Sequence, residues 1–529
     1  MHLINDNLPD NPEELKALVL EKDEIILCKD EHITILEEQI RVLKKAIFGR
    51  KSEKRPVEEE GSRQLHLFNE AEVLLEQESQ KKLVIPEHTR QKPKRKPLPK
   101  DLPRVEVIHD IEESEKVCQC GAELSRIGEE VCEKLDIIPA KIRVIRHIRP
   151  KYACRNCEGV DSEGPTVKIA SPPAQIIPKG IATAGLVAHI AVSKYADALP
   201  LYRQENIFSR YGIDLNRSTM AGWMVKAAET CDPVIKLLYK QLHSGPLVNV
   251  DETPLQVLNE PGRANTTKSY MWVFRGGPPD KPAILFRYSQ TRSGDVPREV
   301  LAGYSGYCQT DAFSGYDGLE ALDSDIILVG CFAHVRRNFV KIIDARGKAA
   351  RNKPGSPEVA LDYIGRLYKV EKTARELKLL PDQIICLRKQ KALPVLEEFK
   401  GWMDKRISQT PPKGLLGQAL SYAITRWPRL VRYLENGHIT PDNNAAENAI
   451  RPFVVGRKNW LFSGHPNGAH AAAALYSLIE TAKACGLEAY QYLRFLFSKI
   501  PYVRAEQDYK ALLPQNLTPE ILSRFMAGQ

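Results

Sequence analysis

The stretch PLVNVDETPLQVL (246–258) is a β-branched, apolar run that is interrupted by Asp251, Glu252 and Thr253. Residues of this kind are enriched in β-strands that pack against a core. We therefore expect a buried strand that places an acid at or near its end, where the strand meets a cleft. This acid alone indicates little, because aspartate at a strand end is often only a turn former.

Four more strand-like runs follow, with helical connections after Arg292. In chain order the runs are SYMWVF, AILFRY, GYCQT and DIILVGC. Three clustered runs followed by strand–helix alternation predict an α/β core whose sheet has mixed strand direction. From Phe339 to about residue 436 the pattern becomes helical and charged, which predicts a helical insertion before the last part of the core.

A second acid lies in GYSGYCQTDAFSGYDGL (303–319), 60 residues after Asp251. A short strand-like piece ends there at Asp311, and glycine and tyrosine turn signals follow it. We expect Asp311 to lie at the edge of the same cleft. Asp317, six residues further along, is the alternative second acid.

A third acid, Glu447, lies in TPDNNAAENAIRPFVVGRKNWLF (440–462) among amides, arginines and a lysine. The segment predicts a short helix that is capped by Asp442 or Asn443 and ended by Pro452. Helical spacing puts three polar residues on the face of Glu447, namely Asn443, Asn444 and Arg451. A divalent metal between the acid and a polyanion would explain a carboxylate among phosphate-seeking cations. The alternative is an ordinary Glu447–Arg451 ion pair, worth only a few tenths of a kcal/mol.

Three acids from separate elements that converge on one point can hold two divalent cations for in-line attack on a phosphodiester. In that arrangement one cation activates the attacking oxygen and the other stabilises the leaving oxygen. Oxygen-only ligands suit Mg²⁺, with Mn²⁺ as a substitute. The three acids together therefore indicate phosphoryl-transfer chemistry on a nucleic acid.

The motifs around these acids resemble those of a known family. They are VDETPLQV (250–257), QTDAFSGYDGL (309–319), CFAHVRRNF (331–339) and NNAAENAIRPFVVGRKNWLFSG (443–464). The chain resembles transposases of the insertion-sequence-66 family, bacterial DDE transposases with a ribonuclease-H-like core, over nearly its whole length. The resemblance implies that Asp251, Asp311 and Glu447 are the catalytic acids and the Mg²⁺ ligands. It also implies double-stranded DNA partners, both element ends and target, and accessory proteins encoded by the element.

Several cations near the acids are candidate DNA ligands. Arg451, Arg457 and Lys458 flank Glu447 and are the stronger candidates for phosphate binding. His334, Arg336 and Arg337 follow the strand-like run DIILVGC and are expected to approach the DNA or the metal site. A histidine beside two arginines could position a scissile phosphate, or it could merely cap a helix.

Composition sets broad limits on the chain. Its 529 residues suffice for three or four domains, and 43% hydrophobic with 27% charged residues is typical of a soluble globular protein. The net charge of +9, from 76 basic and 67 acidic residues, permits a nucleic-acid partner without requiring one. No apolar run approaches the ~20 residues of a membrane span. The N-terminus has no signal-like apolar core, and the eleven scattered cysteines favour reduced thiols in a cytoplasm. The family resemblance implies a bacterial cytoplasm, near the nucleoid.

Residues 13–47 predict a coiled coil. Their heptad positions hold Val19, Ile26, Ile33, Ile40 and Ile47, with Leu15, Leu36 and Leu43 in the companion row, which Lys22 and Lys29 interrupt. This favours a homo-oligomer, at least a dimer, although a single amphipathic helix packed on the protein's own core is the alternative. Residues 48–103 read as a basic flexible linker, and eight Lys or Arg residues with one acid occur between 81 and 100.

Residues 104–170 predict a small zinc-ribbon-like module. Two cysteine pairs, Cys118 with Cys120 and Cys154 with Cys157, are about thirty residues apart and could form a tetrahedral zinc site. The first pair is C-x-C, which departs from the usual family pattern, so Cys132 or His147 could replace a ligand. A β-module without metal is the alternative. By the resemblance, this module is a zinc-finger-like DNA-binding domain.

Residues 178–245 read as a helical DNA-binding region. The piece 201–229 predicts a helix, a turn centred on Gly212 and a second helix capped by Ser218. This is the pattern of a helix–turn–helix, with Arg217, Ser218 and Thr219 at the start of the recognition helix, although an ordinary αα-hairpin fits equally. The remaining expected boundaries are the first part of the core, the helical insertion, the helices with the last acid and a C-terminal tail: 246–340, 341–439, 440–500 and 501–529.

Two other functions fit the same acids. The chain could be a catalytically inactive DNA-binding regulator that retains the fold, or a structure-specific nuclease that cleaves DNA without joining it. Intact acids at all three positions argue against the first. A strand-transfer assay separates the second from a transposase.

Overall fold

The computed structural model describes residues 142–153, 167–311, 313–320, 325–345 and 355–528, with part of the residues between 11 and 44. The chain divides into two compact units. One unit consists of residues 81–173, and the other joins residues 1–80 to residues 174–529. No helix among the described residues is long and apolar enough to cross a membrane.

A mixed sheet forms the centre of the larger unit. Its strands are β3 (Leu247–Val257), β4 (Lys268–Gly276), β5 (Ala283–Ser289), β6 (Gly306–Gln309) and β7 (Ile326–Val329), in the spatial order β5-β4-β3-β6-β7. β4 is antiparallel to both β3 and β5, whereas β6 is parallel to β3 and β7. The five predicted strands and the mixed strand direction are therefore confirmed. A short strand, β8 (Phe462–Ser463), pairs in parallel with the end of β3.

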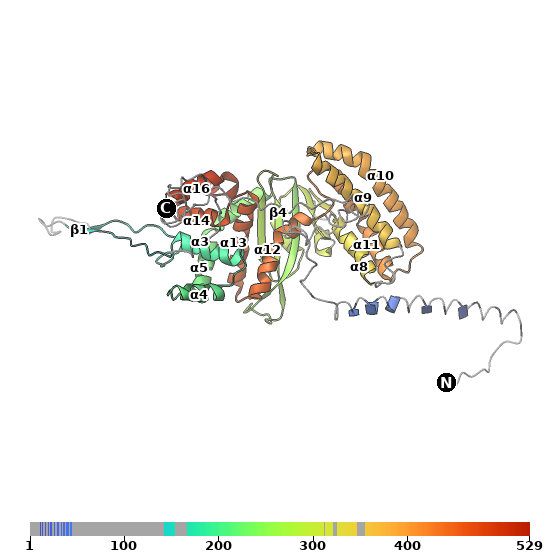
Figure 1. Cartoon of the computed structure of the whole chain (residues 1–529), viewed down its shortest axis with the longest axis horizontal. Coiled ribbons are helices and arrows are strands. Elements are labelled where there is room, and N and C mark those ends of the chain that lie inside the picture. The colour runs from blue at the N-terminus through green and yellow to red at the C-terminus, as the bar shows by residue number, and fades with distance from the viewer. Residues whose placement is uncertain are drawn as a thin grey trace, which may run out of the picture. The chain divides into compact units, whose positions relative to one another are not determined.

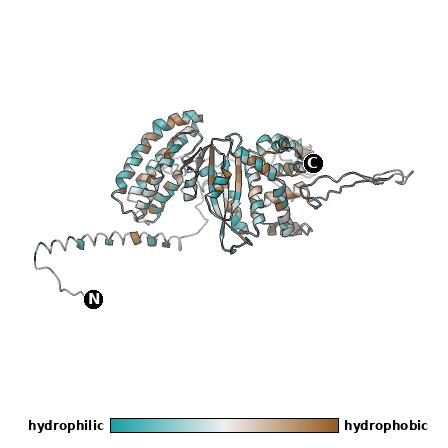
Figure 2. Cartoon of the chain, turned by 180° about the vertical axis from the view of Figure 1, so that it is seen from behind, coloured by the Kyte–Doolittle hydropathy of each residue, from teal (hydrophilic) through white to brown (hydrophobic). Residues whose placement is uncertain are grey.

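The sheet is held by apolar side chains on its two faces. On one face Val250 of β3 and its register partner Phe274 of β4 are fully buried, and on the other face Met271 and Val273 of β4 are fully buried. All four belong to one core that also includes Phe453 of a C-terminal helix. Figure 2 shows brown, apolar residues along the central strands, while the surrounding helices mix teal and brown. Burial on both faces explains why these strands read as nearly continuous apolar runs in the sequence.

Two groups of helices share the core of the sheet. The first comprises α3 (Ala184–Tyr195), α4 (Leu201–Arg210), α5 (Arg217–Thr230) and α6 (Asp232–Leu242). The second comprises α12 (Asn444–Trp460), α13 (Pro466–Ala484), α14 (Ala489–Lys499), α15 (Glu506–Ala511) and α16 (Pro519–Ala527). In Figure 1 α3, α5, α13 and α14 lie on the same side of the sheet. Thr481 and Ser477 of α13 also hydrogen-bond the backbone of β5.

The helices α4 and α5 are joined by a turn at Gly212, whose φ of 74° lies in the left-handed region that glycine favours. The helix α5 is capped by Asn216, whose side chain accepts hydrogen bonds from the backbone N–H groups of Ser218 and Thr219. The predicted Ser218 cap is therefore wrong by two residues. Asparagine is the better acceptor because it reaches both exposed N–H groups of the first turn.

A second core lies within the segment between β7 and α12. It contains α8 (Phe332–Ala345), α9 (Ser356–Glu376), α10 (Pro381–Ile407) and α11 (Leu415–Leu430), followed by the 3₁₀ turn η4 (Val431–Leu434). Their buried side chains include Phe332, Phe339, Phe399 and Tyr433. Figure 1 places this group on the side of the sheet opposite α13 and α14. The predicted helical segment is thus observed.

Other parts of the chain are described only in part. The described residues between Glu13 and Lys44 are helical, and six large apolar side chains along them are exposed: Leu20, Ile26, Ile33, Leu36, Ile40 and Leu43. In the smaller unit β1 (Lys151–Ala153) pairs antiparallel with β2 (Val167–Ile169), and His147 is exposed. The predicted linker, 48–103, and five cysteines lie outside the described residues: Cys118, Cys120, Cys132, Cys154 and Cys157.

Candidate functional site

Asp251 lies in the middle of β3, so its predicted place at a strand end is wrong. β3 continues to Val257 because β4 pairs with it as far as Gln256. The relevant end belongs to β6, whose pairing with β3 stops at Asn249. β8 pairs with β3 only from Gln256 onward, so Asp251 lies where this edge of β3 has no strand partner among the described residues. Asp251 therefore lies beside a gap in the strand pairing rather than at a strand end.

Asp311 follows β6 by two residues. The backbone N–H of Thr310 still bonds Val329 of β7, and the carboxylate of Asp311 then accepts a hydrogen bond from the N–H of Phe313. This bond turns the chain into η2 (Ser314–Leu319) and fixes the carboxylate. Arg292 Nη2 lies 3.8 Å from Asp311 Oδ2.

Glu447 lies in the first turn of α12 and is 6% exposed. Its Oε1 atom is 3.6 Å from Arg337 Nη2 and forms no hydrogen bond within the described residues. α12 is held against β3 by two side chains. Asn443 donates to the Val250 carbonyl at 2.8 Å, and Arg457 donates to Thr253 Oγ1 at 2.9 Å. The first turn of α12 is therefore fixed one residue away from Asp251.

One prediction about α12 is wrong, and of the two predicted capping side chains it is Asp442 that binds the first turn. Pro452 does not end the helix, which continues to Trp460. Proline in a helix interior removes one backbone hydrogen bond, but Ile450 and Phe453 on either side are buried and hold the helix in place. Asn443 occupies the N-cap position but makes no side-chain capping bond among the described residues, because its amide binds β3. Asp442 instead accepts from the Asn444 N–H.

Burial and neighbouring charges change the pKa of two of the three acids, Asp251 and Glu447. Burial raises the pKa of Asp251 well above its ordinary value of 3.8, and the charges of Glu252, Glu447 and Asp311 raise it further. Burial also raises the pKa of Glu447, against the opposing charge of Arg337. The charges that act on Asp251 place the carboxylates of the β6 loop and of α12 within electrostatic range of β3. Such shifts occur mainly at functional sites.

Glu252 is a fourth carboxylate in this region, and the sequence reasoning did not assign it. Its side chain is 1% exposed and accepts hydrogen bonds from Arg292 and from the hydroxyl of Tyr316. The guanidinium of Arg292 lies 3.8 Å from the ring centre of Phe313, so Arg292 joins β3 to the loop after Asp311. The neighbouring acids in VDET were the only sequence signal for Glu252, and Arg292 gave none.

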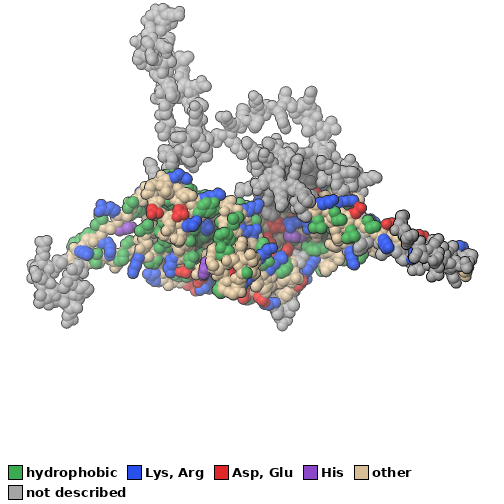
Figure 3. Space-filling view, turned by 90° about the horizontal axis from the view of Figure 1, so that it is seen from below, with side chains coloured by type: hydrophobic (Ala, Val, Ile, Leu, Met, Phe, Trp, Pro, Cys, Tyr) green, Lys and Arg blue, Asp and Glu red, His purple; other side chains and the backbone are tan. Residues whose placement is uncertain are grey.

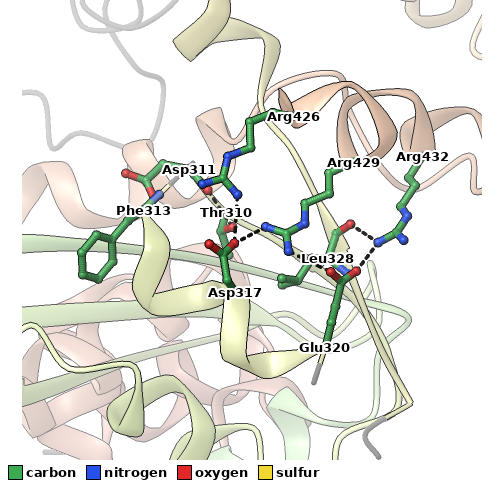
Figure 4. A network of polar contacts seen from close by, with 9 residues as sticks. All are labelled: Thr310, Asp311, Phe313, Asp317, Glu320, Leu328, Arg426, Arg429 and Arg432. Carbon is green, nitrogen blue, oxygen red and sulfur yellow. Dashed lines mark hydrogen bonds and ion pairs between the residues drawn. The ribbon is translucent and has the colours of Figure 1, made fainter. Parts of the chain in front are cut away.

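Asp317 lies in a different environment from Asp311. Figure 4 shows it within a network of three arginines from α11 and η4, together with Glu320. Arg426 donates to Asp317 at 2.9 Å, and Arg429 also binds it. Partial burial opposes ionisation of Asp317, but the hydrogen bonds from Arg429 and Arg426 outweigh it and lower the pKa. Asp317 therefore joins η2 to the helical segment, which disfavours it as the second acid.

The candidate DNA ligands fall into three groups. Arg337 and Lys458 are exposed, and Arg451 is partly buried beside Glu447. The guanidinium of Arg457 binds β3 at Thr253 and Pro254. His334 is in the first turn of α8, and burial with the charges of Arg337 and Lys341 lowers its pKa to about 4. Figure 3 shows lysine and arginine side chains spread over one face rather than gathered in a single patch.

The donor set fits a hard divalent cation. Asp251, Asp311 and Glu447 offer only carboxylate oxygens, and Glu447 Oε1 is a buried acceptor without a hydrogen bond among the described residues. A cation at this point would also relieve the repulsion between the acids. The described residues nevertheless contain no three His, Cys, Asp or Glu side chains arranged around one metal position. In this structure the three acids therefore do not form a closed set of metal ligands.

Comparisons with known proteins agree over most of the chain. Residues 179–471 match the model described as "Transposase IS66 family", and residues 477–515 match the "IS66 C-terminal element". Residues 115–158 match the "zinc-finger binding domain of transposase IS66", which spans all four predicted zinc cysteines, and residues 35–107 match "Transposase C of IS166 homeodomain". The family implies a divalent metal ion, and the zinc-finger match suggests zinc.

Similar full-length proteins occur in Sinorhizobium fredii. The chain is 34% identical to the uncharacterized protein y4qI over 448 residues, which cover 82% of this chain and 80% of that protein. It is 35% identical to the uncharacterized protein y4jD over 417 residues, which cover 76% of this chain and 78% of that protein. Together with the family matches, these similarities show that the chain belongs to the IS66 transposase family.

Proposed function

We propose that the chain catalyses DNA transposition by a DDE mechanism, in which Asp251, Asp311 and Glu447 are the catalytic acids. Water would hydrolyse a phosphodiester at each end of a mobile element, and the freed 3′-hydroxyl would then attack target DNA. The observation that carries this proposal is the burial of Asp251 within electrostatic range of two acids from separate elements, Glu447 and Asp311. Such an arrangement has no structural benefit, because it disfavours the ionised form of Asp251.

The sheet supports a ribonuclease-H-like core for this chemistry. Three antiparallel strands, β3 to β5, are followed by two parallel strands, β6 and β7. The proposed acids lie on the central strand β3, after its parallel neighbour β6, and on helix α12, which is hydrogen-bonded to β3. In this proposal α8 to α11 are an insertion between the last core strand and the helix with Glu447.

Asp251, Asp311 and Glu447 would hold Mg²⁺ or Mn²⁺, which would activate the attacking oxygen and stabilise the leaving oxygen. The protein would contribute mainly positioning and charge, and no covalent intermediate with a side chain is required. Arg337, exposed beside Glu447, is suited to contact the scissile phosphate. Arg451 and Lys458 would contact the flanking backbone. Arg457 would act indirectly, because its guanidinium is bound to β3.

The other parts of the chain would deliver the DNA. We propose that Cys118, Cys120, Cys154 and Cys157 hold a structural Zn²⁺ in the zinc-finger domain. Helices α4 and α5 would contact DNA through the start of α5, where Arg217, Ser218 and Thr219 are exposed. The N-terminal helix would pair with a second copy, so that two element ends are brought together.

The experiment is incubation of the full-length protein with labelled element ends, target DNA and Mg²⁺, with EDTA as the control. A transposase produces both nicked ends and joined products, and EDTA abolishes both. Nicking without joining would identify a structure-specific nuclease. Binding without either product would identify an inactive regulator and refute the proposed chemistry.

A further inference from the structure

Three buried amide side chains connect the elements that carry the acids. Asn249, Gln309 and Asn443 are 2%, 0% and 1% exposed. Each precedes one proposed acid by two to four residues: Asn249 before Asp251, Gln309 before Asp311 and Asn443 before Glu447. We refer to these three side chains as the amide triad.

The amides of the triad bind one another. Asn249 Nδ2 donates to Gln309 Oε1 at 2.9 Å and to Asn443 Oδ1 at 3.0 Å. Asn249 and Gln309 are also direct partners in the parallel register of β3 and β6. Both N–H groups of the Asn249 amide are therefore used to join β3 to its neighbouring strand and to α12.

The remaining N–H donors of the triad bind backbone carbonyls on β3, after β7 and before α12. Gln309 Nε2 donates to Gly330, after β7, at 3.2 Å and to Thr440, before α12, at 2.7 Å. Asn443 Nδ2 donates to Val250 at 2.8 Å, one residue before Asp251. The backbone carbonyl of Asn443 in turn accepts a hydrogen bond from the backbone N–H of Glu447 at 3.2 Å. Hydrogen bonds thus connect the backbone of Glu447 and that of Val250, next to Asp251, with Gln309, two residues before Asp311.

The chemistry of the amides suits this position. A buried amide is costly unless it is hydrogen-bonded, so the network strongly favours one arrangement of β3, β6 and α12. Apolar side chains of similar size would fill the space but would not favour one orientation of the two strands and the helix. Charged side chains would add to a pocket that already contains mutually repelling carboxylates. An amide forms directional hydrogen bonds and carries no charge.

We propose that Asn249, Gln309 and Asn443 are positioning residues that hold the three acids in the arrangement needed to bind the divalent cation. The inference rests on the proposed function of the acids, since it assigns the triad a role in that same site. The triad touches neither substrate nor cation, and it acts through the backbone segments that carry the acids. Loss of a supporting hydrogen bond behind a metal ligand typically weakens metal affinity about 10–100-fold.

The test compares Asn249→Leu and the milder Asn443→Ser with Ser477→Ala. Ser477 Oγ accepts a buried hydrogen bond from the Phe286 N–H at 2.8 Å, so its loss removes a comparable bond between α13 and β5. For each full-length variant we would measure the Tm, the affinity for Mn²⁺ by titration calorimetry without DNA, and the Mn²⁺ dependence of element-end cleavage. If Asn249→Leu does not fold, Asn443→Ser decides the test.

We expect the triad variants to bind Mn²⁺ about 10–100-fold more weakly than the wild type and to need correspondingly more Mn²⁺ for half-maximal cleavage. Ser477→Ala should lower the Tm and keep the wild-type Mn²⁺ affinity. Triad variants that match Ser477→Ala in Mn²⁺ affinity would overturn the proposal, as would a wild type that binds no Mn²⁺. A wild type that binds Mn²⁺ but cleaves no DNA refutes the proposed function, while weaker binding by the triad variants still supports positioning.

Discussion

The carboxylate of Asp251 lies near three others, and folding brings them together at a cost. Each buried carboxylate loses hydration, and each neighbour of like charge raises the cost of ionising the next. Nearby cations offset the negative charge of the acids only in part. Arg337 lies 3.6 Å from Glu447, and Arg292 lies 3.8 Å from Asp311. An acidic pocket of this kind is stabilised when a cation binds it.

Asp251→Asn, Asp311→Asn and Glu447→Gln are each expected to reduce element-end cleavage by about 10³-fold or more while DNA binding is largely retained, because each removes charge from the pocket and leaves the shape unchanged. Cleavage and gel-shift assays measure the two effects. The matched control is Asp317→Asn, which loses the ion pairs with Arg426 and Arg429 and should still cleave. The reverse result, with Asp311→Asn active and Asp317→Asn inactive, would transfer the second acid to Asp317.

His334 predicts a dependence of stability on pH. Burial and the charges of Arg337 and Lys341 lower its pKa from 6.5 to about 4. Between these values the unfolded chain binds a proton that the folded protein does not, so stability falls as the pH decreases from 6.5 toward 4. The Tm of the wild type should therefore drop more steeply between pH 7 and pH 5 than that of His334→Gln. Parallel Tm curves for the two proteins would contradict the buried, neutral state of His334.

At the scale of elements, α9 and α10 position the segment that leads into α12. Arg388 of α10 is 1% exposed and forms a bidentate pair with Glu371 of α9, at 2.8 and 2.7 Å. Its remaining N–H groups reach three backbone carbonyls between η4 and α12, those of Tyr433, Asn436 and Ile439. The helical segment therefore fixes the chain that precedes Glu447.

Arg388→Met is expected to destabilise the protein by about 3–5 kcal/mol, because Glu371 would be left buried without its partner. Arg366 offers a matched control. It pairs with Glu398 across the same two helices at 2.9 Å, but both side chains are exposed, so Arg366→Met should cost less than about 1 kcal/mol. Chemical denaturation of both variants measures the difference. Equal losses would show that the burial of Arg388 does not matter.

The N-terminus of α5 gives a second prediction at this scale. Asn216→Ala removes the acceptor for the N–H groups of Ser218 and Thr219 and should cost about 0.5–2 kcal/mol. Ser218→Ala removes no capping acceptor and should change stability by less than about 0.5 kcal/mol. Thermal unfolding distinguishes the two. A larger effect at Ser218 would restore the cap that the sequence predicted.

At the scale of the whole molecule, the described residues of the N-terminal helix include a row of apolar side chains that is not buried against the rest of the described chain. Ile26, Ile33 and Ile40 repeat every seven residues and are each about half exposed. A second copy in parallel register would bury this row, as two-stranded coiled coils do. A transposase that joins two element ends would benefit directly from such pairing.

Replacement of Ile33 and Ile40 together by glutamate is expected to reduce self-association of the full-length chain, because charged side chains would face each other across the seam. Analytical ultracentrifugation measures the effect. Arg41→Gln, which changes an exposed residue beside the seam, should leave the oligomeric state unchanged. If the glutamate variant has the mass of the wild type, another surface holds the copies together.

The sequence determined the helices and strands of this protein, and it identified the three acids that are candidates for catalysis. Apolar runs specify strands wherever both faces are buried, and the acids in VDET and QTDAF are visible because each interrupts or ends such a run. Glu447 is visible because it lies among amides and cations on a predicted helix. Heptad spacing likewise specified the N-terminal helix. These features depend on neighbours within a few residues, which sequence patterns record.

Only the tertiary structure decided which side chains meet. The continuation of α12 through Pro452, the use of Asn443 to bind β3 rather than to cap its own helix, and the difference between Asp311 and Asp317 all depend on contacts between distant segments. The same is true of Glu252, Arg292 and the amide triad. Arg292 and Glu252 are 40 residues apart in the sequence, Asn249 and Asn443 are 194 apart, and local propensity contains no information about such pairs.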